Sequence, residues 1–374
     1  ADLLCGRENE RTLRWELDRR RSFGLLSHRK AAQVKAQIRH LVDQGYLALS
    51  DGDYPVLSQG PRARELSSGS AQVTMRMKAG QSIKEIGPTW HMSKQGTPTM
   101  GGLMFIIGSA AAVLLLGWPD FAAGRFGGGF VLLFALVFGV IGYIDDYVKV
   151  KKHQNTGLTA PQKFLLQLAA AIVFTVLMRN HHYLTPDLYI PFVNVTLSLP
   201  WPVYMVFAAF VMVGTVNAVN ITDGIDGLAT GVTMPVMLFF TAVACFWGQL
   251  ELGIFSAGLF GGLCGFLIYN FHPAKVFMGD TGSLFLGGAV CGLAFALDIP
   301  LVLILVGIIY ILETLSDILQ VGYFKLTHGK RIFRMAPLHH HLELGGWSEV
   351  KLFCVFSGVT LLACVLAFLG VMGR

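Results

Sequence analysis

A succession of long apolar segments occupies the chain from Met100 onward and restricts its fold more than any other feature. Nine such runs follow one another, at about 100–118, 128–144, 163–179, 201–216, 233–248, 252–269, 282–297, 299–319 and 351–372. A membrane-spanning helix needs roughly 17–25 apolar residues, and several runs are at the short end of this range. Because a backbone inside lipid must satisfy its own hydrogen bonds, such runs form helices. The sequence therefore predicts an all-α polytopic membrane protein of about nine transmembrane helices.

Composition supports this class. The chain is 53% hydrophobic and only 14% charged, whereas soluble proteins carry roughly 25% charged residues. The net charge of +6 belongs mainly to residues 1–78, which hold 14 Lys+Arg against 9 Asp+Glu. Ala1–Arg21 is charged throughout and lacks the apolar core of a signal peptide. The six cysteines show no CxxC spacing, so we expect neither a zinc site nor a disulfide framework.

Residues 1–76 differ from the rest and form a small soluble α/β segment by pattern. Ala31–Gln44 has the apolar spacing of a helix, and Tyr46–Leu49 and Tyr54–Leu57 flank a Ser-Asp-Gly-Asp turn typical of a β-hairpin. A helix followed by a two-stranded wing suggests a nucleic-acid module. From pattern alone, a solvated basic face explains the charges equally well.

A resemblance favours the nucleic-acid interpretation. The segment resembles the winged-helix region of RecQ-type DNA helicases through FGLL, IRHLVDQGYL, DYPVL and VTMR. No GxxxxGK[ST] phosphate loop occurs in the chain, so any DNA binding here would proceed without a helicase motor. We interpret the chain as a fusion of residues 1–76 with a membrane domain at 77–374.

Charge indicates the sidedness of the membrane domain. If nine helices alternate, the segments 77–99, 145–162, 217–232, 270–281 and 320–350 emerge on one side. Together with residues just inside the helix ends, that side carries twelve Lys and Arg residues. The opposite side has three, namely Arg125, Arg179 and Arg374. The positive-inside rule makes the first side cytoplasmic, and the polar motifs of the domain all lie there.

The stretch NAVNITDGIDGLA, between two apolar runs, is the first of these motifs. Asn217, Asn220, Asp223 and Asp226 recur every three residues, so in a helical or tightly turned segment they would share roughly one face. Polar groups at the end of a membrane span are functional candidates. The alternative is a solvated turn, but a turn needs only one Asp-Gly pair and this stretch has two.

Three further motifs lie at the ends of apolar runs, and two of them contain carboxylates. Asp145 and Asp146 end the second apolar run, and adjacent carboxylates repel unless they share a cation or a proton. This suits Mg²⁺ or a general base, and the alternative is a helix-end pair facing water. Asp280 lies between glycines in VFMGDTGS, where the chain can fold closely around an ion or pyrophosphate. SKQGTPTMGG at 93–102 could cradle phosphate or be a flexible entry loop.

Three consecutive histidines at 339–341 lie near Arg331 and Arg334. They could bind an anion, shuttle a proton or hold zinc. Zinc is the weaker reading, because consecutive residues point apart and no cysteine accompanies them. Glu313 and Asp317, one turn apart in the eighth run, stay without an assigned role, as does His272. Carboxylates, a metal and cationic anchors together indicate phosphoryl transfer at a bilayer boundary.

The motifs also carry a resemblance. Residues 77–374 are similar to the phospho-N-acetylmuramoyl-pentapeptide transferase family, through KQGTPTMGG, GYIDDY, NAVNITDGIDGLA, VFMGDTGS, ETLSDILQVG and RIFRMAPLHHHLEL. The resemblance implies transfer of phospho-N-acetylmuramoyl-pentapeptide from its UDP conjugate to undecaprenyl phosphate, giving lipid I and UMP for peptidoglycan synthesis. It implies Mg²⁺ as cofactor, a bacterial inner membrane with the site on the cytoplasmic face, and a homodimer as a candidate assembly. Family members have ten spans, and the first would be absent here.

The resemblance also implies roles for individual residues. Asp280 would bind Mg²⁺, and Asp145 would deprotonate the lipid phosphate or attack as a nucleophile, with Asp146 in support. Asp223 would complete the catalytic surface with the histidines His339, His340 and His341. The substrate-binding residues, mainly on the nucleoside side, would be Lys94, Thr99, Asn220, Asp226, Asn270 and Phe277, whose ring would stack on uracil.

Three alternatives remain at the level of sequence. The first is a polyprenyl-phosphate N-acetylglucosamine-1-phosphate transferase of the same superfamily, which shares the aspartates but differs in the histidine loop. The second is an inactive protein that tethers DNA to the membrane through residues 1–76. The third is a transporter, which is less favoured because the acidic residues gather at one membrane face.

Overall fold

The computed structural model describes residues 4, 22, 25–26, 31–49, 57–68, 73, 97–152 and 157–374. The chain divides into two compact units, Ala1–Lys78 and Ala79–Arg374. Each unit is considered by itself.

The first unit contains the expected helix and hairpin. Helix α2 (Ala31–Asp43) is followed by an antiparallel pair of strands, β1 (Leu47–Leu49) and β2 (Leu57–Gln59), with Leu49 opposite Leu57. The second strand begins at Leu57, where the predicted strand ends. A short helix α3 (Ala63–Ser67) follows. The small α/β character predicted for this segment is confirmed.

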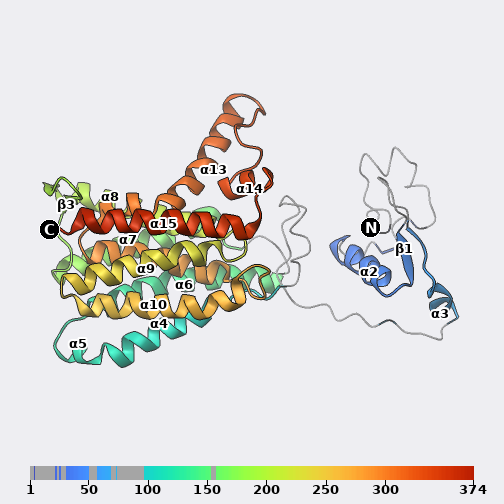
Figure 1. Ribbon diagram of the computed structural model, residues 1–374, viewed down its shortest axis with the longest axis horizontal. Coiled ribbons are helices and arrows are strands. Elements are labelled where there is room, and N and C mark those ends of the chain that lie inside the picture. The colour runs from blue at the N-terminus through green and yellow to red at the C-terminus, as the bar shows by residue number, and fades with distance from the viewer. Residues whose placement is uncertain are drawn as a thin grey trace. The chain divides into compact units, whose positions relative to one another are not determined.

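The second unit is a helical bundle with one hairpin (Figure 1). Its helices are α4 (Leu103–Leu116), α5 (Trp118–Ala122), α6 (Gly127–Lys152), α7 (Ala160–Asn180), α8 (Trp201–Thr222), α9 (Leu228–Phe246), α10 (Leu250–Asn270), α11 (Gly279–Ala296), the 3₁₀ turn η3 (Pro300–Val302), α12 (Leu303–Val306), α13 (Ile308–Leu326), α14 (Leu338–Glu343) and α15 (Glu349–Val371). Strands β3 (Asp187–Ile190) and β4 (Val195–Ser198) pair antiparallel between α7 and α8.

Every predicted apolar run is helical, which confirms an all-α polytopic membrane fold. Within the described residues, the seven helices α6–α11 and α15 are long and apolar enough to span a membrane. Two of the nine runs differ from simple spans. Helix α4 has only 14 residues. The eighth run bends by 80° between Pro300–Val306 and Ile308–Leu326, and it makes an eighth span if the two parts count as one. Figure 1 shows α13 leaving the bundle at this bend.

Helix α11 forms the centre of the bundle, and small residues let its neighbours approach it closely. A Cβ added to Gly287 would lie 2.6 Å from the Cα of Val216 on α8. A Cβ added to Gly288 would lie 3.1 Å from the Cα of Ala135 on α6. Glycine at helix contacts is a common packing device in membranes, where close van der Waals contact drives association. The close packing places the ends of α6, α8 and α11 beside one another.

The alternating helix directions sort the chain between two ends of the bundle. One end gathers the last turns of α6, α8 and α10 and the first turns of α7, α9, α11 and α15. The opposite end carries α5 and the β3–β4 hairpin (Figure 1). The three arginines predicted for that opposite end each have a partner there: Arg125 pairs with Asp120, Arg179 lies over the ring of Trp201, and Arg374 pairs with Asp298.

Candidate active site

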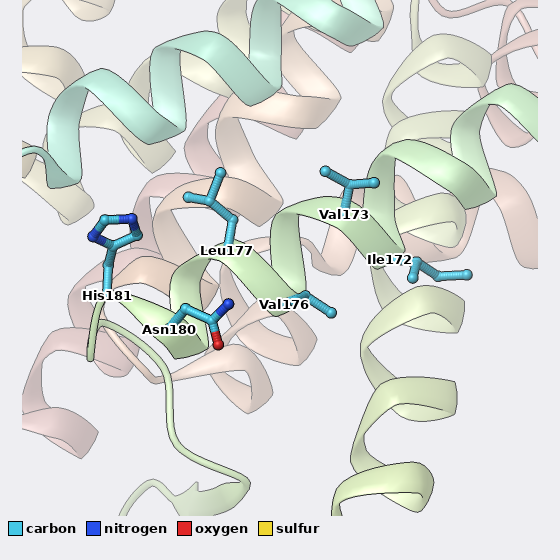
Figure 2. A pocket seen from close by; sticks show the side chains of 6 residues that line it. All are labelled: Ile172, Val173, Val176, Leu177, Asn180 and His181. Atoms are coloured by element: carbon cyan, nitrogen blue, oxygen red, sulfur yellow. The ribbon is translucent and has the colours of Figure 1, made fainter.

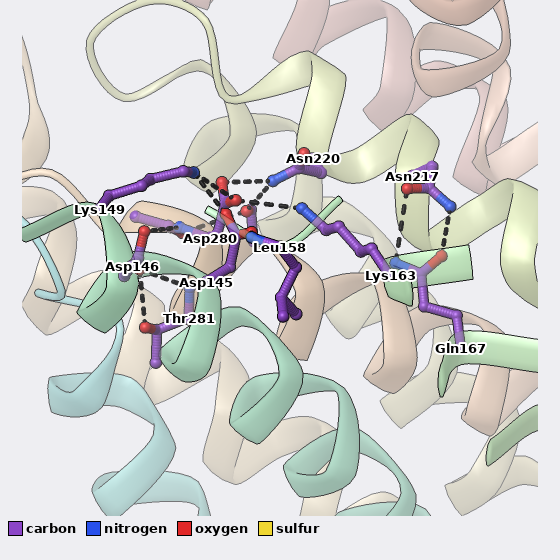
Figure 3. Close-up of polar contacts among 12 residues, drawn as sticks. Asp145, Asp146, Lys149, Leu158, Lys163, Gln167, Asn217, Asn220, Asp280 and Thr281 are labelled. Carbon is purple, nitrogen blue, oxygen red and sulfur yellow. Dashed lines mark hydrogen bonds and ion pairs between the residues drawn. The ribbon is translucent and has the colours of Figure 1, made fainter. Parts of the chain in front are cut away.

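A cluster of carboxylates and lysines joins α6, α7, α8 and α11 at the first end (Figure 3). Lys149 Nζ lies 2.5 Å from Asp145 Oδ2 and 2.8 Å from Asp280 Oδ2. Lys163 Nζ lies 3.0 Å from the same oxygen of Asp280. Asn220 Nδ2 donates a hydrogen bond to the other oxygen, Asp280 Oδ1, at 3.1 Å. Asp280 is therefore the common partner of three elements.

Asp146 holds the first turn of α11. Its Oδ2 accepts hydrogen bonds from the backbone N–H and the hydroxyl of Thr281, at 2.9 and 2.8 Å. A carboxylate at a helix N-terminus satisfies free N–H groups and the helix dipole. Gly142 lets α6 approach this turn, because an added Cβ would lie 2.1 Å from the carbonyl oxygen of Asp280. From the sequence, we expected the adjacent Asp145 and Asp146 to share a cation or a proton. In the structure each has its own partners.

The loop that follows α6 returns to Asp145. The backbone N–H of Leu158 donates to Asp145 Oδ1 at 2.7 Å. A Cβ added to Gly157 would lie 2.3 Å from that oxygen, so the backbone passes directly over the carboxylate. Thr159 then caps α7, which presents Lys163 in its first turn. Both oxygens of Asp145 are held, and the residue is only 3% exposed.

A second cluster lies around Asp226 at the beginning of α9. Asp226 Oδ2 accepts a hydrogen bond from the N–H of Ala274 at 2.9 Å and lies 3.0 Å from His272 Nδ1. Glu349 Oε2 accepts the backbone N–H of Asp226 at 3.0 Å, and its Oε1 lies 3.5 Å from His272 Nδ1. The three side chains could hold a cation, since their ligand atoms lie within 4.8 Å of one another. The hydrogen bonds by themselves account for the arrangement.

Asn270 and Phe277 belong to the segment that carries His272. Asn270 accepts a hydrogen bond from the hydroxyl of Thr230 at 2.8 Å and donates to the carbonyl of Val276 at 3.0 Å. The N–H of Phe277 donates to the carbonyl of Pro98 at 2.9 Å, and its side chain is half-buried. The buried amide of Asn270 therefore fixes the loop that presents the aromatic ring.

Thr99 lies beside Asp146, at the entrance to α4. A Cβ added to Gly279 would meet Asp146 Oδ2 at 2.6 Å and Thr99 Oγ1 at 2.8 Å, and Gly279 has a φ of +71°. The hydroxyl of Thr99 is buried without a hydrogen-bond partner among the described residues. Lys94, the other residue predicted in this motif, lies outside the described residues.

Asp223 links the two clusters. Burial, together with the charges of Asp280, Asp146 and Asp226, raises the pKa of Asp223 well above its ordinary value. The next residue, Gly224, packs against His339, because an added Cβ would lie 2.2 Å from the imidazole Nε2. The turn at 223–226 therefore borders the carboxylate cluster, the Asp226 cluster and the histidines.

The residues that recur every three positions from Asn217 to Asp226 lie partly in a helix and partly in a turn. Helix α8 ends at Thr222, so the last two members lie in a turn. Asn217 Nδ2 donates to Gln167 at 2.7 Å, whereas Asn220 contacts Asp280. The repeat therefore continues from a helix into a turn, and its members contact different neighbours.

The histidines also diverge. They have three different partners: His339 Nδ1 lies 2.8 Å from Glu313 Oε2, His340 Nδ1 lies 2.7 Å from Glu343 Oε2, and His341 Nδ1 accepts the backbone N–H of Arg334 at 3.1 Å. Of the three, we place His339 against the 223–226 turn.

Several contributors were not assigned to the site from sequence. Lys149 and Lys163 counted only as positive charges, and Glu313 and His272 had no role. Lys149 follows Asp145 by one helical turn, a spacing that could have suggested an ion pair. The other contacts join distant parts of the chain and leave no local signal.

An apolar groove leads away from the carboxylate cluster between α7 and α8. It has a volume of about 490 Å³, and its lining includes Phe164, Phe210 and, at the polar end, Asn217. Phe164 directly follows Lys163, which contacts Asp280. A different pocket of about 360 Å³ lies on α7 towards the opposite end of the bundle, around Val176 and His181 (Figure 2). Its lining includes no carboxylate, so it is not the candidate site.

The cluster suits a divalent cation with oxygen ligands. Four carboxylates (Asp145, Asp146, Asp223 and Asp280) and two lysines (Lys149 and Lys163) give a formal charge of −4 + 2 = −2 when all are ionised. Mg²⁺ prefers one or two carboxylates together with substrate phosphates. At Asp280, Lys149 and Lys163 both contact Oδ2, so a cation at this carboxylate would bind at Oδ1 or displace a lysine.

Comparison with known proteins identifies the family of the chain. The profile of glycosyl transferase family 4 matches residues 129–298, phospho-N-acetylmuramoyl-pentapeptide-transferase signature 1 matches 94–106, and the RQC domain matches 1–84. The phospho-N-acetylmuramoyl-pentapeptide-transferase of Clostridium acetobutylicum is 49% identical over 296 residues, covering 79% of this chain and 90% of the relative. The enzyme of that name from Acetivibrio thermocellus is 48% identical over 297 residues, covering 78% and 87%. The one from Listeria monocytogenes is 43% identical over 295 residues, covering 78% and 90%. The chain belongs to the phospho-N-acetylmuramoyl-pentapeptide-transferase family.

Proposed function

We propose that the protein transfers phospho-N-acetylmuramoyl-pentapeptide from its UDP conjugate to undecaprenyl phosphate, with release of UMP and formation of lipid I. The observation that carries this proposal is the convergence of Lys149, Lys163 and Asn220 on Asp280 at the end of several membrane helices. Phosphoryl transfer depends mainly on positioning and on stabilising charge. A cluster of fixed opposite charges supplies both.

Asp145 is the proposed base for the phosphate of the lipid substrate. Lys149 and the N–H of Leu158 fix its two oxygens. It needs no unusual basicity, since the second proton of a phosphate monoester leaves near pKa 6. Lys149 and Lys163 would then contact phosphate oxygens, and direct attack by Asp145 on the donor is the alternative route.

Mg²⁺ is the proposed cofactor, with Asp280 as its protein ligand. When bound, the ion would neutralise charge on the diphosphate of the donor. Asp146 keeps Asp280 in place through the first turn of α11. Lys163 would balance charge at the same carboxylate.

The nucleoside would bind beside the loop that carries Asn270 and Phe277. Asp226 and Asn270 brace this loop, so the ring of Phe277 can offer a stacking surface. Lys94 and Thr99 are proposed to complete this side. Because Asn220 contacts Asp280 in the structure, we propose that Asn220 acts near the diphosphate of the donor.

The groove between α7 and α8 is proposed to receive the apolar chain of the lipid. It is lined largely by apolar side chains, and its lining includes Phe164, which directly follows Lys163, and Asn217, one helical turn before Asn220. The site end of the bundle would face the cytoplasm of a bacterium, in line with the twelve Lys and Arg residues predicted there. A homodimer remains a candidate assembly.

UMP release by the purified full chain tests this function. We expect release from the UDP-linked donor only when undecaprenyl phosphate and Mg²⁺ are both present. Asp280→Ala should abolish release, whereas Asp187→Ala, in the hairpin at the opposite end, should not. Turnover by Asp280→Ala, or turnover in a chelator, would refute the assignment.

The RQC match at residues 1–84 favours a second activity, binding of duplex DNA. Binding carried by Lys and Arg on phosphates must weaken as salt increases, because counterions are released. Titration of a fluorescent duplex with the full chain at two salt concentrations measures this. Absent or salt-independent binding would contradict the proposal.

A further inference from the structure

Glu313 and His339 form a fully buried pair where α13 meets α14. The imidazole Nδ1 lies 2.8 Å from Glu313 Oε2, and both side chains are 0% exposed. The same carboxylate also faces the backbone N–H of His339, at 3.2 and 3.4 Å. Glu313 therefore fixes both the ring and the backbone of this histidine.

The other ring nitrogen has no such contact. Nε2 of His339 is buried and has no hydrogen-bond partner among the described residues. A buried polar atom without a partner is unfavourable, so its presence needs an explanation. The nitrogen is directed at Gly224, where an added Cβ would lie 2.2 Å away, and Gly224 itself is exposed. The unpaired atom thus lies next to the open turn that follows Asp223.

The Glu313–His339 pair also determines which ring nitrogen can contact a ligand at that turn. An ionised carboxylate only accepts hydrogen bonds, so the Nδ1 beside Glu313 carries a proton. With Nδ1 held by Glu313, Nε2 is the ring atom that can form a hydrogen bond with a group arriving at the turn. Such a group would relieve the unpaired nitrogen.

From these contacts we infer that Glu313 is a positioning residue: it holds His339 so that Nε2 hydrogen-bonds with a phosphate group of the donor substrate. This inference rests on the proposed function, which supplies the diphosphate. Other groups also act on His339. The ring of His340 lies 4.2 Å away between centroids, and Asp317 interacts with His339 through its charge.

Kinetics of Glu313→Gln test the inference. Glutamine keeps the size and can still accept the backbone N–H, but it lacks the charge and can donate to Nδ1. We expect kcat to fall on the order of 10²-fold, the lower range for a positioned acid–base group, with little change in KM. In a His339→Ala background the same substitution should have no further effect. The control is Glu251→Gln, another buried carboxylate, at the opposite end of the bundle.

Comparing Glu313→Gln in the wild type and in the His339→Ala background separates positioning of His339 from general stabilisation of the fold. If Glu313 only supports the fold, Glu313→Gln lowers activity by the same factor with and without His339, and the inference is overturned. Unchanged kcat in the single variant overturns it as well.

A spectroscopic measurement decides the inference without turnover. In the full chain labelled with ¹⁵N-histidine, His339 is identified by its loss in His339→Ala. We expect a protonated Nδ1 in the wild type at about pH 8, where a free imidazole is neutral, and a changed Nδ1 resonance in Glu313→Gln. An unprotonated Nδ1, or an unchanged spectrum, overturns the inference. A wild-type protein that shows the expected resonances but releases no UMP refutes the proposed function alone.

Discussion

Replacing Gly142 with alanine should move Asp280 on α11 away from Asp145 and Asp146 on α6 without changing any of these carboxylates. Gly142 lies on α6, one turn before Asp145 and Asp146. An added Cβ would lie 2.1 Å from the carbonyl oxygen and 2.4 Å from the carbonyl carbon of Asp280, both backbone atoms. An ordinary contact needs about 3.4 Å, so α6 and α11 must move apart locally by about 3.4 − 2.1 = 1.3 Å.

This displacement sets the expected magnitude. A misplacement of about 1 Å at a reacting centre can cost 10²-fold in rate, and overpacking at a tight contact costs about 1–3 kcal/mol of stability. We therefore expect Gly142→Ala to lower kcat for UMP release roughly 10²-fold, with a melting temperature only moderately reduced in detergent.

Gly139 supplies a matched control, since it lies one turn earlier on the same helix. Its added Cβ would lie 3.4 Å from Phe285 Cβ, an ordinary contact. Gly139→Ala should keep both rate and stability near those of the wild type. Wild-type kinetics in Gly142→Ala, or equal losses in both variants, would refute the packing argument.

Two further predictions use other contacts. Lys163→Met removes one partner of the partly buried Asp280. A hydrogen bond to a charged group contributes about 2 kcal/mol, so kcat/KM should fall roughly 30-fold. Exposed Lys151→Met is the control, and equal effects would contradict the pairing. Burial raises the pKa of Asp298, so its stabilising contribution is present below the ordinary pKa and is lost as pH rises through the raised value. Thermal unfolding from about pH 4 upward should therefore show Asp298→Asn gaining stability relative to the wild type, and a constant difference would argue against it.

The sequence was sufficient for the class of fold. Long apolar runs must become helices in lipid, because no other local structure satisfies the backbone there. The sequence also placed Asp145, Asp146, Asp223 and Asp280 at one end of the bundle. Successive helices run in opposite directions, so every second connection lies on the same side. What the runs could not indicate was the 80° bend before α13 or the short length of α4.

The arrangement of the site depended on contacts between distant segments. Lys163 meets Asp280 across 117 positions, and His272 meets Asp226 across 46. Periodicity grouped Asn217, Asn220, Asp223 and Asp226, but it could not indicate that α8 ends at Thr222 or which partner each residue has.

By itself, then, the sequence determined a polytopic helical protein with its acidic and histidine motifs at one end, because hydrophobicity and chain direction are local properties. Only the tertiary structure decided which groups pair. The Glu313–His339 contact exists because α13 bends out of the bundle and returns through α14. The approach of Asp280 to Asp145 exists because Gly142 leaves room for the backbone of α11. Such pairings depend on how helices pack, which no single segment specifies.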